Sequence, residues 1–224
     1  MSPLSRSIAI YGGTFDPFHN GHLRMAVEVR ESLGLPVLFL IPSARPPHKP
    51  HLPVSPAPHR LAMARAAVAG VEGLEVLDLE LRREGPSYSL LTVLEVRAAH
   101  PGADVLFLIG TDAFSEIATW HRYRELLDAC DFLLLPRPGT PQETAIPPGV
   151  LLEPEGNHCY SLPGRSYRLP GGRKVLCPVL PVLDISSRSV RDKVRRGKSL
   201  RGLVAPEVER YIADHGLYRD EEGG

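Results

Sequence analysis

The chain has 224 residues, of which 43% are hydrophobic and 23% charged, and its 26 Lys and Arg residues equal its 26 Asp and Glu residues. These proportions exclude a disordered or fibrous protein, and the zero formal net charge argues against a protein built mainly to bind nucleic acid. No apolar run reaches the roughly 18 residues of a membrane helix, and three scattered cysteines suit a reducing compartment, so we expect a cytoplasmic protein without a disulfide framework.

Apolar runs typical of buried strands alternate along the chain with segments of helical periodicity. Strands are expected at 8–11, 37–41, 74–81, 105–109, 132–135 and 179–183, and helices at 22–33, 59–69, 88–99 and 207–215. Short connections between such elements require parallel strands with helices on both faces, so the pattern predicts a doubly wound, Rossmann-like α/β fold. In this fold, ligands bind beyond the carboxyl ends of the strands.

The length suits one domain spanning residues 1–224. Within it, the stretch 153–174 is dense in turn-forming residues and lacks helical periodicity, which predicts a loop or hairpin excursion that could act as a lid. A helical segment is expected at 186–218, followed by a frayed tail at 220–224.

The first candidate site follows the first expected strand and reads Gly-Gly-Thr-Phe-Asp-Pro-Phe-His-Asn-Gly-His from residue 12. The glycines let backbone N–H groups approach a ligand, and the two histidines lie where a helix begins and its dipole favours an anion. Two surface histidines placed by chance are the alternative, but the preceding strand and the glycines favour a phosphate site. Its candidate residues are Gly12, Gly13, Thr14, Phe15, His19 and His22.

A second candidate phosphate site lies in the segment Asp-Ile-Ser-Ser-Arg-Ser-Val-Arg, expected between the strand 179–183 and a helix. Either serine can cap the helix, and the two arginines, three residues apart, share one helix face and carry guanidinium groups that suit phosphate oxygens. A capped helix with solvated basic residues is the alternative, and we favour it for the basic residues at 193–201. The candidates are Ser186, Ser187, Arg188 and Arg191.

Three further motifs offer ligand contacts with weaker support. Lys49 ends the loop Pro-Pro-His-Lys, Ser87 and Tyr88 precede an expected helix, and Asp112 follows a strand that leads to the only tryptophan, Trp120. Taken alone, these residues also suit a surface loop, a helix cap and a core tryptophan.

Together, these motifs resemble those of a known enzyme family. The first two candidate sites resemble signatures of the nucleotidyltransferase superfamily, which shares His-x-Gly-His with class I aminoacyl-tRNA synthetases. With the three further motifs, the chain resembles bacterial nicotinate-nucleotide adenylyltransferases from residue 8 to about 191, with 153–174 unmatched. The resemblance implies adenylyl transfer from ATP to nicotinate mononucleotide (NaMN) in NAD biosynthesis, with nicotinate adenine dinucleotide (NaAD) and pyrophosphate as products.

The resemblance also implies residue roles. His19 and His22 would be catalytic, and the glycine loop and the 186–191 segment would bind the ATP phosphates. Mg²⁺ would arrive with ATP, with no metal site in the protein itself. Trp120 would stack on the nicotinate ring and Asp112 would hold a ribose hydroxyl. The NaMN-binding residues would be Lys49, Ser87, Tyr88, Asp112, Trp120 and Arg137.

One departure from the family pattern is visible: Leu91-Thr92-Val93 stands where members often carry Asp-Thr-Leu, which affects helix packing rather than chemistry. The alternatives are a sister enzyme acting on NMN, phosphopantetheine or a sugar or polyol phosphate, or a non-catalytic nucleotide-binding module. An RNA-binding protein, suggested by the basic run 188–201, is a third. We expect small-molecule substrates, no nucleic-acid or membrane partner, and leave homo-oligomerisation open.

Overall fold

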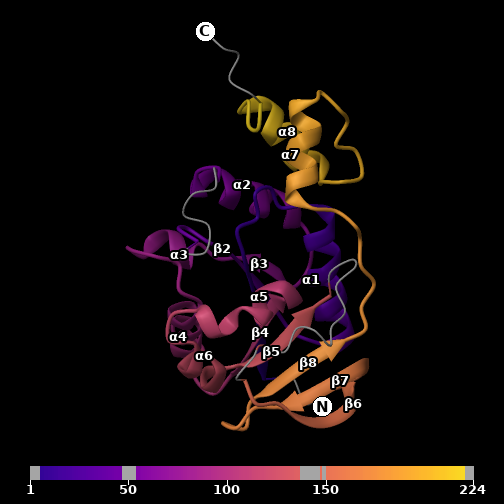
Figure 1. Cartoon of the computed structure of the whole chain (residues 1–224). Helices are drawn as coiled ribbons and strands as arrows, with labels where there is room; N and C mark the ends of the chain where they lie inside the picture. The colour runs from indigo at the N-terminus through magenta and orange to yellow at the C-terminus, as the bar shows by residue number, and fades with distance from the viewer. Residues whose placement is uncertain (1–5, 47–53, 137–146, 148–149, 220–224) are drawn as a thin grey trace.

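The computed structural model describes residues 6–46, 54–136, 147 and 150–219 (Figure 1). Its strands are β1 (Ser7–Gly13), β2 (Leu38–Pro42), β3 (Leu74–Val76), β4 (Asp104–Gly110), β5 (Asp131–Leu135), β6 (Glu153–Cys159), β7 (Leu162–Arg168) and β8 (Lys174–Pro178). Its helices are α1 (Asn20–Leu33), α2 (Ala57–Val68), α3 (Leu79–Arg82), α4 (Ser89–Ala99), α5 (Thr111–Ser115), the 3-10 helix η1 (Ile117–Thr119), α6 (Tyr123–Ala129), α7 (Ser187–Arg195) and α8 (Pro206–Asp214).

The strands form one sheet in the order β3-β2-β1-β4-β5-β8-β7-β6. The first six in this order pair in parallel, which confirms the predicted doubly wound α/β class. The last two, β7 and β6, form an antiparallel hairpin that extends the sheet beyond β8. Strand order reverses between β1 and β4, and a ligand site is expected beyond their carboxyl ends.

Two of the predicted strands are placed differently in the structure. The predicted strand 179–183 is wrong: the strand is β8, and the chain after it runs without regular structure to α7. Pro181 lacks the N–H that a ladder needs, and Val179 is 64% exposed, so this apolar run is not a buried strand. The predicted strand 74–81 ends at Val76, and the chain then turns into α3.

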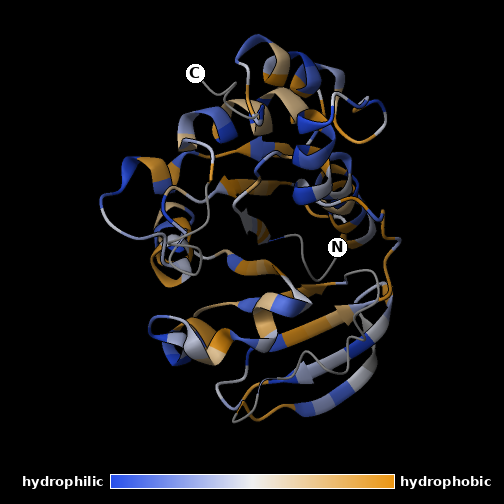
Figure 2. Cartoon of the chain, turned by 45° about the horizontal axis from the view of Figure 1, so that its top comes forward, coloured by the Kyte–Doolittle hydropathy of each residue, from blue (hydrophilic) through white to orange (hydrophobic). Residues whose placement is uncertain are grey.

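Alternating side chains of the strands pack on opposite faces of the sheet, as the period of two requires. Leu38 and Leu40 of β2 belong to a core that includes residues of α1, α2 and α8, whereas Phe39 and Ile41 belong to a core with residues of α4, α5 and α6. Figure 2 shows the apolar parallel strands between the helices and a more polar hairpin at the edge. None of the helices in the described ranges is long and apolar enough to cross a membrane.

Candidate active site

A cavity of about 1280 Å³ opens at the carboxyl ends of β1 and β4. It brings together segments that are far apart in the sequence, namely the loop after β1, the start of α4, the chain around η1, and the start of α7. The predicted site residues that line it are Gly12, Gly13, Thr14, Phe15, His19, His22, Ser87, Tyr88, Asp112, Trp120, Ser186, Ser187, Arg188 and Arg191. Lys49 and Arg137 lie outside the described residues.

The two histidines form the N-terminal cap of α1. The Nδ1 atom of His19 accepts a hydrogen bond from the N–H of His22, and Nδ1 of His22 accepts one from the N–H of His19, both at 3.3 Å. Their rings stack with centroids 3.6 Å apart. A Cβ on Gly21 would lie 3.0 Å from Nδ1 of His19, so the glycine between the histidines lets the two rings pack this closely.

The loop before the histidines is tightly wound. A Cβ on Gly13 would lie 2.7 Å from the ring of Phe15, and Phe15 itself has a φ of 50°, in the left-handed region. The ring of Phe15 in turn packs edge-on against His22, with centroids 5.0 Å apart. Gly13 and Phe15 therefore fix the shape of the backbone that lines this part of the cavity.

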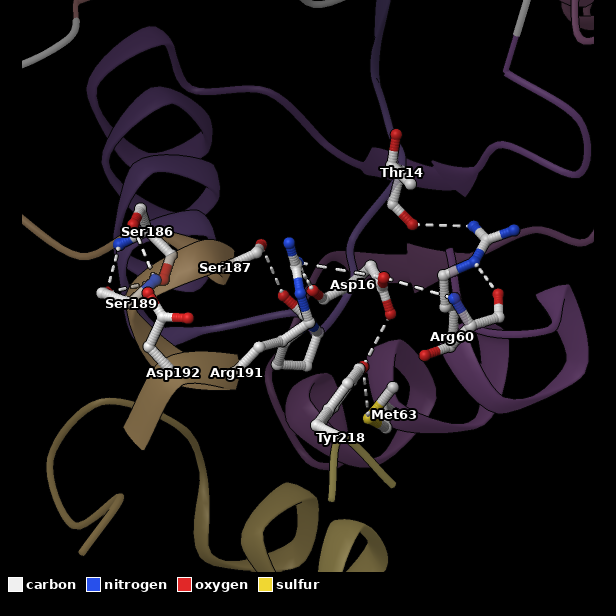
Figure 3. A network of polar contacts seen from close by, with 12 residues as sticks. Thr14, Asp16, Arg60, Met63, Ser186, Ser187, Ser189, Arg191, Asp192 and Tyr218 are labelled. Atoms are coloured by element: carbon white, nitrogen blue, oxygen red, sulfur yellow. Dashed lines mark hydrogen bonds and ion pairs between the residues drawn. The ribbon is translucent and has the colours of Figure 1, made fainter. Parts of the chain in front are cut away.

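A buried arginine that the sequence analysis missed supports this loop (Figure 3). Arg60 of α2 is 1% exposed and donates hydrogen bonds to the carbonyl oxygens of Thr14 at 2.7 Å, Ser55 at 2.8 Å and Ala44 at 3.3 Å. Burial lowers the pKa of Arg60, while the nearby Asp16 opposes this shift. The guanidinium stays charged because its ordinary pKa is so high.

Asp16 is a residue of the loop after β1, which we call the β1 loop. It is the second buried charged residue at this site and is 4% exposed. Its Oδ1 atom accepts a hydrogen bond from the Tyr218 hydroxyl at 2.7 Å, and Oδ2 accepts one from the N–H of Ser55 at 3.3 Å. Arg191 of α7 donates to the carbonyl oxygen of Asp16 at 2.6 Å and lies 3.9 Å from its carboxylate. One aspartate thus connects the β1 loop, α7 and the C-terminal segment.

The second candidate phosphate motif contacts the first at the start of α7. Ser186 is the N-cap and forms a reciprocal capping box with Ser189. The hydroxyl of Ser187 donates to the carbonyl oxygen of Pro17 at 3.0 Å, so Ser187 and Arg191 both hold the β1 loop. Arg188 is exposed at the cavity rim.

A second group of rings, here called the aromatic end, lines the cavity beside the start of α4 and η1. Tyr88 precedes α4 without capping it through its side chain, and its ring stacks on that of His121 with centroids 4.1 Å apart. The neighbouring Trp120 is partly buried, and Asp112 lies in the first turn of α5, directly after β4. The Ser87 hydroxyl accepts a hydrogen bond from the N–H of Arg45 at 3.0 Å, which ties this turn to the chain after β2.

Buried Glu80 also lines the cavity, and the sequence analysis did not find it. Its Oε1 atom accepts a hydrogen bond from the Thr92 hydroxyl at 2.7 Å, and Arg83 donates to the same hydroxyl at 3.0 Å. Thr92 is the residue of the Leu91-Thr92-Val93 segment that keeps the family pattern, but the sequence gave no signal of its contact with Glu80.

Two observations concern the histidine, cysteine and carboxylate side chains of the residues that the structure describes. In those ranges no group of three or more His, Cys, Asp or Glu side chains is placed to hold a metal ion. Cys130 is fully buried, and burial raises the pKa of its thiol, so it remains a protonated core residue.

Known proteins resemble this chain over nearly its whole length. Residues 10–193 match the family model described as Cytidylyltransferase-like. A Pseudomonas syringae pv. tomato protein named "Probable nicotinate-nucleotide adenylyltransferase" is 45% identical over 220 residues, which cover 98% of this chain and 96% of that protein. A Pseudomonas fluorescens protein of the same name is 45% identical over 217 residues, with coverages of 96% and 99%.

The fold also matches a solved structure, that of Plasmodium falciparum nicotinic acid mononucleotide adenylyltransferase complexed with NaAD. The TM-score is 0.69 at 19% identity, and the match covers 95% of this chain and 97% of that chain. At this identity the likeness concerns the fold alone.

Proposed function

The chain belongs to the nicotinate-nucleotide adenylyltransferases, within the cytidylyltransferase-like family, and from that premise we propose that it transfers the adenylyl group of ATP to NaMN. The products are NaAD and pyrophosphate, and the reaction is a step of NAD biosynthesis. The observation that carries the proposal is the single cavity that joins the stacked histidines and the start of α7 to the aromatic end around Trp120. Because one cavity draws on all these segments, we propose that the chain acts as one catalytic domain.

The chemistry is an in-line displacement at the α-phosphorus of ATP. A phosphate oxygen of NaMN forms a bond to this phosphorus, and the bond from the phosphorus to the oxygen bridging to the β-phosphate breaks, releasing pyrophosphate. Such a transfer depends on positioning and on charge compensation rather than on a protein nucleophile. His19, His22 and the backbone N–H groups of residues 13–15 stabilise the charge on the transferring phosphoryl group.

The ATP end of the cavity, also called the phosphate end, comprises the β1 loop, the two histidines and the start of α7. We assign the ATP phosphates to the start of α7. Its dipole favours phosphate, the exposed Arg188 can follow the leaving pyrophosphate, and Ser187 and Arg191 border the same space. ATP enters with a divalent cation as its substrate complex, and we assign Mg²⁺ because this ion keeps water and substrate phosphates as ligands.

The NaMN end is assigned to the aromatic part of the cavity. Trp120 stacks on the nicotinate ring and Asp112 holds a ribose hydroxyl, while Ser87 and Tyr88 border the start of α4. This helix start has no side-chain cap, and the N–H groups of Leu91 and Thr92 donate to the Tyr88 carbonyl. We assign the first two N–H groups, those of Ser89 and Leu90, to the negatively charged ring substituent. Lys49 and Arg137 belong to the same proposed subsite through the family resemblance alone.

The second candidate is a sister enzyme with another phosphate acceptor, because the phosphate end by itself suits any such acceptor. A comparison of pyrophosphate release from ATP with NaMN, NMN and phosphopantetheine separates the two. We expect the highest kcat/KM with NaMN. A higher value with either rival would reassign the acceptor, and no pyrophosphate release with any of the three would indicate a binding module. We place the reaction in the cytoplasm on the cysteine count.

A further inference from the structure

Tyr218 reaches the phosphate end of the cavity from the last described turn of the chain. It lines the cavity beside the β1 loop, and its hydroxyl donates to Oδ1 of Asp16 at 2.7 Å across 202 residues of sequence. Its φ of 63° lies in the left-handed region, which is uncommon for a residue with a large side chain. Packing therefore holds Tyr218 in a position that its backbone does not favour.

The segment that carries Tyr218 is anchored to the fold independently of the cavity. Val208 and Ile212 of α8 are buried in the core shared with α1 and α2. The hydroxyl of Tyr211 pairs with Nδ1 of His59 on α2 at 3.0 Å. The C-terminal segment is thus a fixed base from which the Tyr218 side chain points to Asp16 (Figure 3).

The hydroxyl of Tyr218 stays protonated and therefore remains a hydrogen-bond donor to Asp16. Burial is the main cause that raises the pKa of Tyr218, and the negative charge of Asp16 raises it further. A buried carboxylate that loses a donor is costly to leave unsatisfied. Among the described residues, the guanidinium of Arg191 forms an ion pair with Asp16, with 3.9 Å between its Nη1 atom and Oδ2.

From this arrangement we infer that Tyr218 is a positioning residue for ATP: by satisfying Asp16, it keeps the Asp16 turn in place and prevents the carboxylate from drawing Arg191 away from the phosphates. Arg191 donates to the main-chain carbonyl of Asp16, so a movement of Asp16 shifts both the β1 loop and the α7 arginine. The inference rests on the proposed function, because it assigns the phosphate end to ATP.

The test compares Tyr218→Phe with Tyr211→Phe in steady-state kinetics with ATP and NaMN. Each variant loses one hydroxyl from the C-terminal segment, but only the hydroxyl of Tyr218 contacts Asp16. We expect Tyr218→Phe to raise the KM for ATP about tenfold, the scale of one hydrogen bond to a charged group, with the KM for NaMN within about twofold. Tyr211→Phe should leave both KM values within about twofold.

A purely structural role gives a different pattern, because less folded enzyme lowers the apparent kcat and leaves both KM values unchanged. That pattern would overturn the inference. An unchanged KM for ATP in Tyr218→Phe would overturn it too, as would an equal effect of Tyr211→Phe.

A second measurement combines Tyr218→Phe with Asp16→Ala in one double variant. If Tyr218 acts through Asp16, the double variant matches Asp16→Ala within about twofold in ATP KM, and a further tenfold rise contradicts the inference.

Pyrophosphate release by the unmodified chain tests the proposed function separately. If the proposed function is wrong, the unmodified chain releases no pyrophosphate from ATP and NaMN. An active unmodified enzyme with an unaffected Tyr218→Phe variant removes the inference alone.

Discussion

The two ends of the cavity are built by different means. At the phosphate end, the buried side chains of Arg60 and Asp16 form hydrogen bonds with main-chain carbonyl and N–H groups. Arg191 of α7 also donates to the β1 loop. At the aromatic end, Tyr88 and His121 stack on each other beside the partly buried Trp120. Buried charged groups that are costly to leave unsatisfied thus support the first end, whereas the second presents stacked rings to the cavity.

This difference follows the chemistry proposed for each end. Charge is redistributed at the transferring phosphoryl group, and donors that are already oriented stabilise it without reorganisation. A nicotinate ring keeps its charge and shape during the reaction, so its subsite needs surface and stacking rather than rigid dipoles. Substitutions at the phosphate end should therefore act on turnover, on the fold or on ATP binding, and those at the aromatic end on NaMN binding.

The largest expected effect is that of His22→Ala. Loss of one oriented donor to the transferring phosphoryl group should lower kcat by about 10²–10³. The lost half of the α1 capping box should lower the free energy of unfolding by only about 1 kcal/mol, measured by urea denaturation. His215→Ala, at the end of α8 and outside the cavity, is the matched control and should keep kcat unchanged. A His22→Ala kcat within a few-fold of the parent would remove His22 from the proposed chemistry.

The next effect concerns the support of the loop. Arg60→Met leaves three carbonyl acceptors without their buried donor, and we expect the free energy of unfolding to fall by about 3 kcal/mol in urea denaturation. Arg65→Met on the same helix is the control, because Arg65 is exposed and pairs only at the surface with Asp78. That change should cost less than about 1 kcal/mol. Equal losses for the two variants would show that burial of Arg60 does not stabilise the phosphate end.

The sequence predicts the parts of the fold and of the site that depend on neighbouring residues. The first strand, the helix that begins at the two histidines, and the serine cap of α7 each follow from a local pattern. The strand expected at 179–183 failed because an apolar run indicates burial only when its backbone can also join a ladder, which Pro181 opposes.

The supports of the site could not be predicted in this way. Arg60 meets Thr14 across 46 residues, and Tyr218 meets Asp16 across 202. No sequence periodicity predicts a contact between residues so far apart. Taken alone, Arg60 is typical of a helix residue and Tyr218 of a residue in a C-terminal tail. The local signal for Arg60 was its spacing of four, seven and eight residues from Ala64, Ala67 and Val68. This spacing places it on the buried face of α2 but indicates no partner.

The smallest expected effects come from a crossed pair of variants, which tests the comparison most directly. Arg188→Ala removes an exposed charge at the ATP end, and Trp120→Ala removes the stacking surface at the other end. A charge-assisted contact and one stacked ring are each worth roughly tenfold in binding, so Arg188→Ala should raise the KM for ATP and Trp120→Ala that for NaMN by about this factor. The other KM should stay within about twofold in each case, because the two side chains border different ends of the cavity. Reversed effects would exchange the two subsites, and equal effects on both substrates would mean that the cavity responds as one unit rather than as two separate ends.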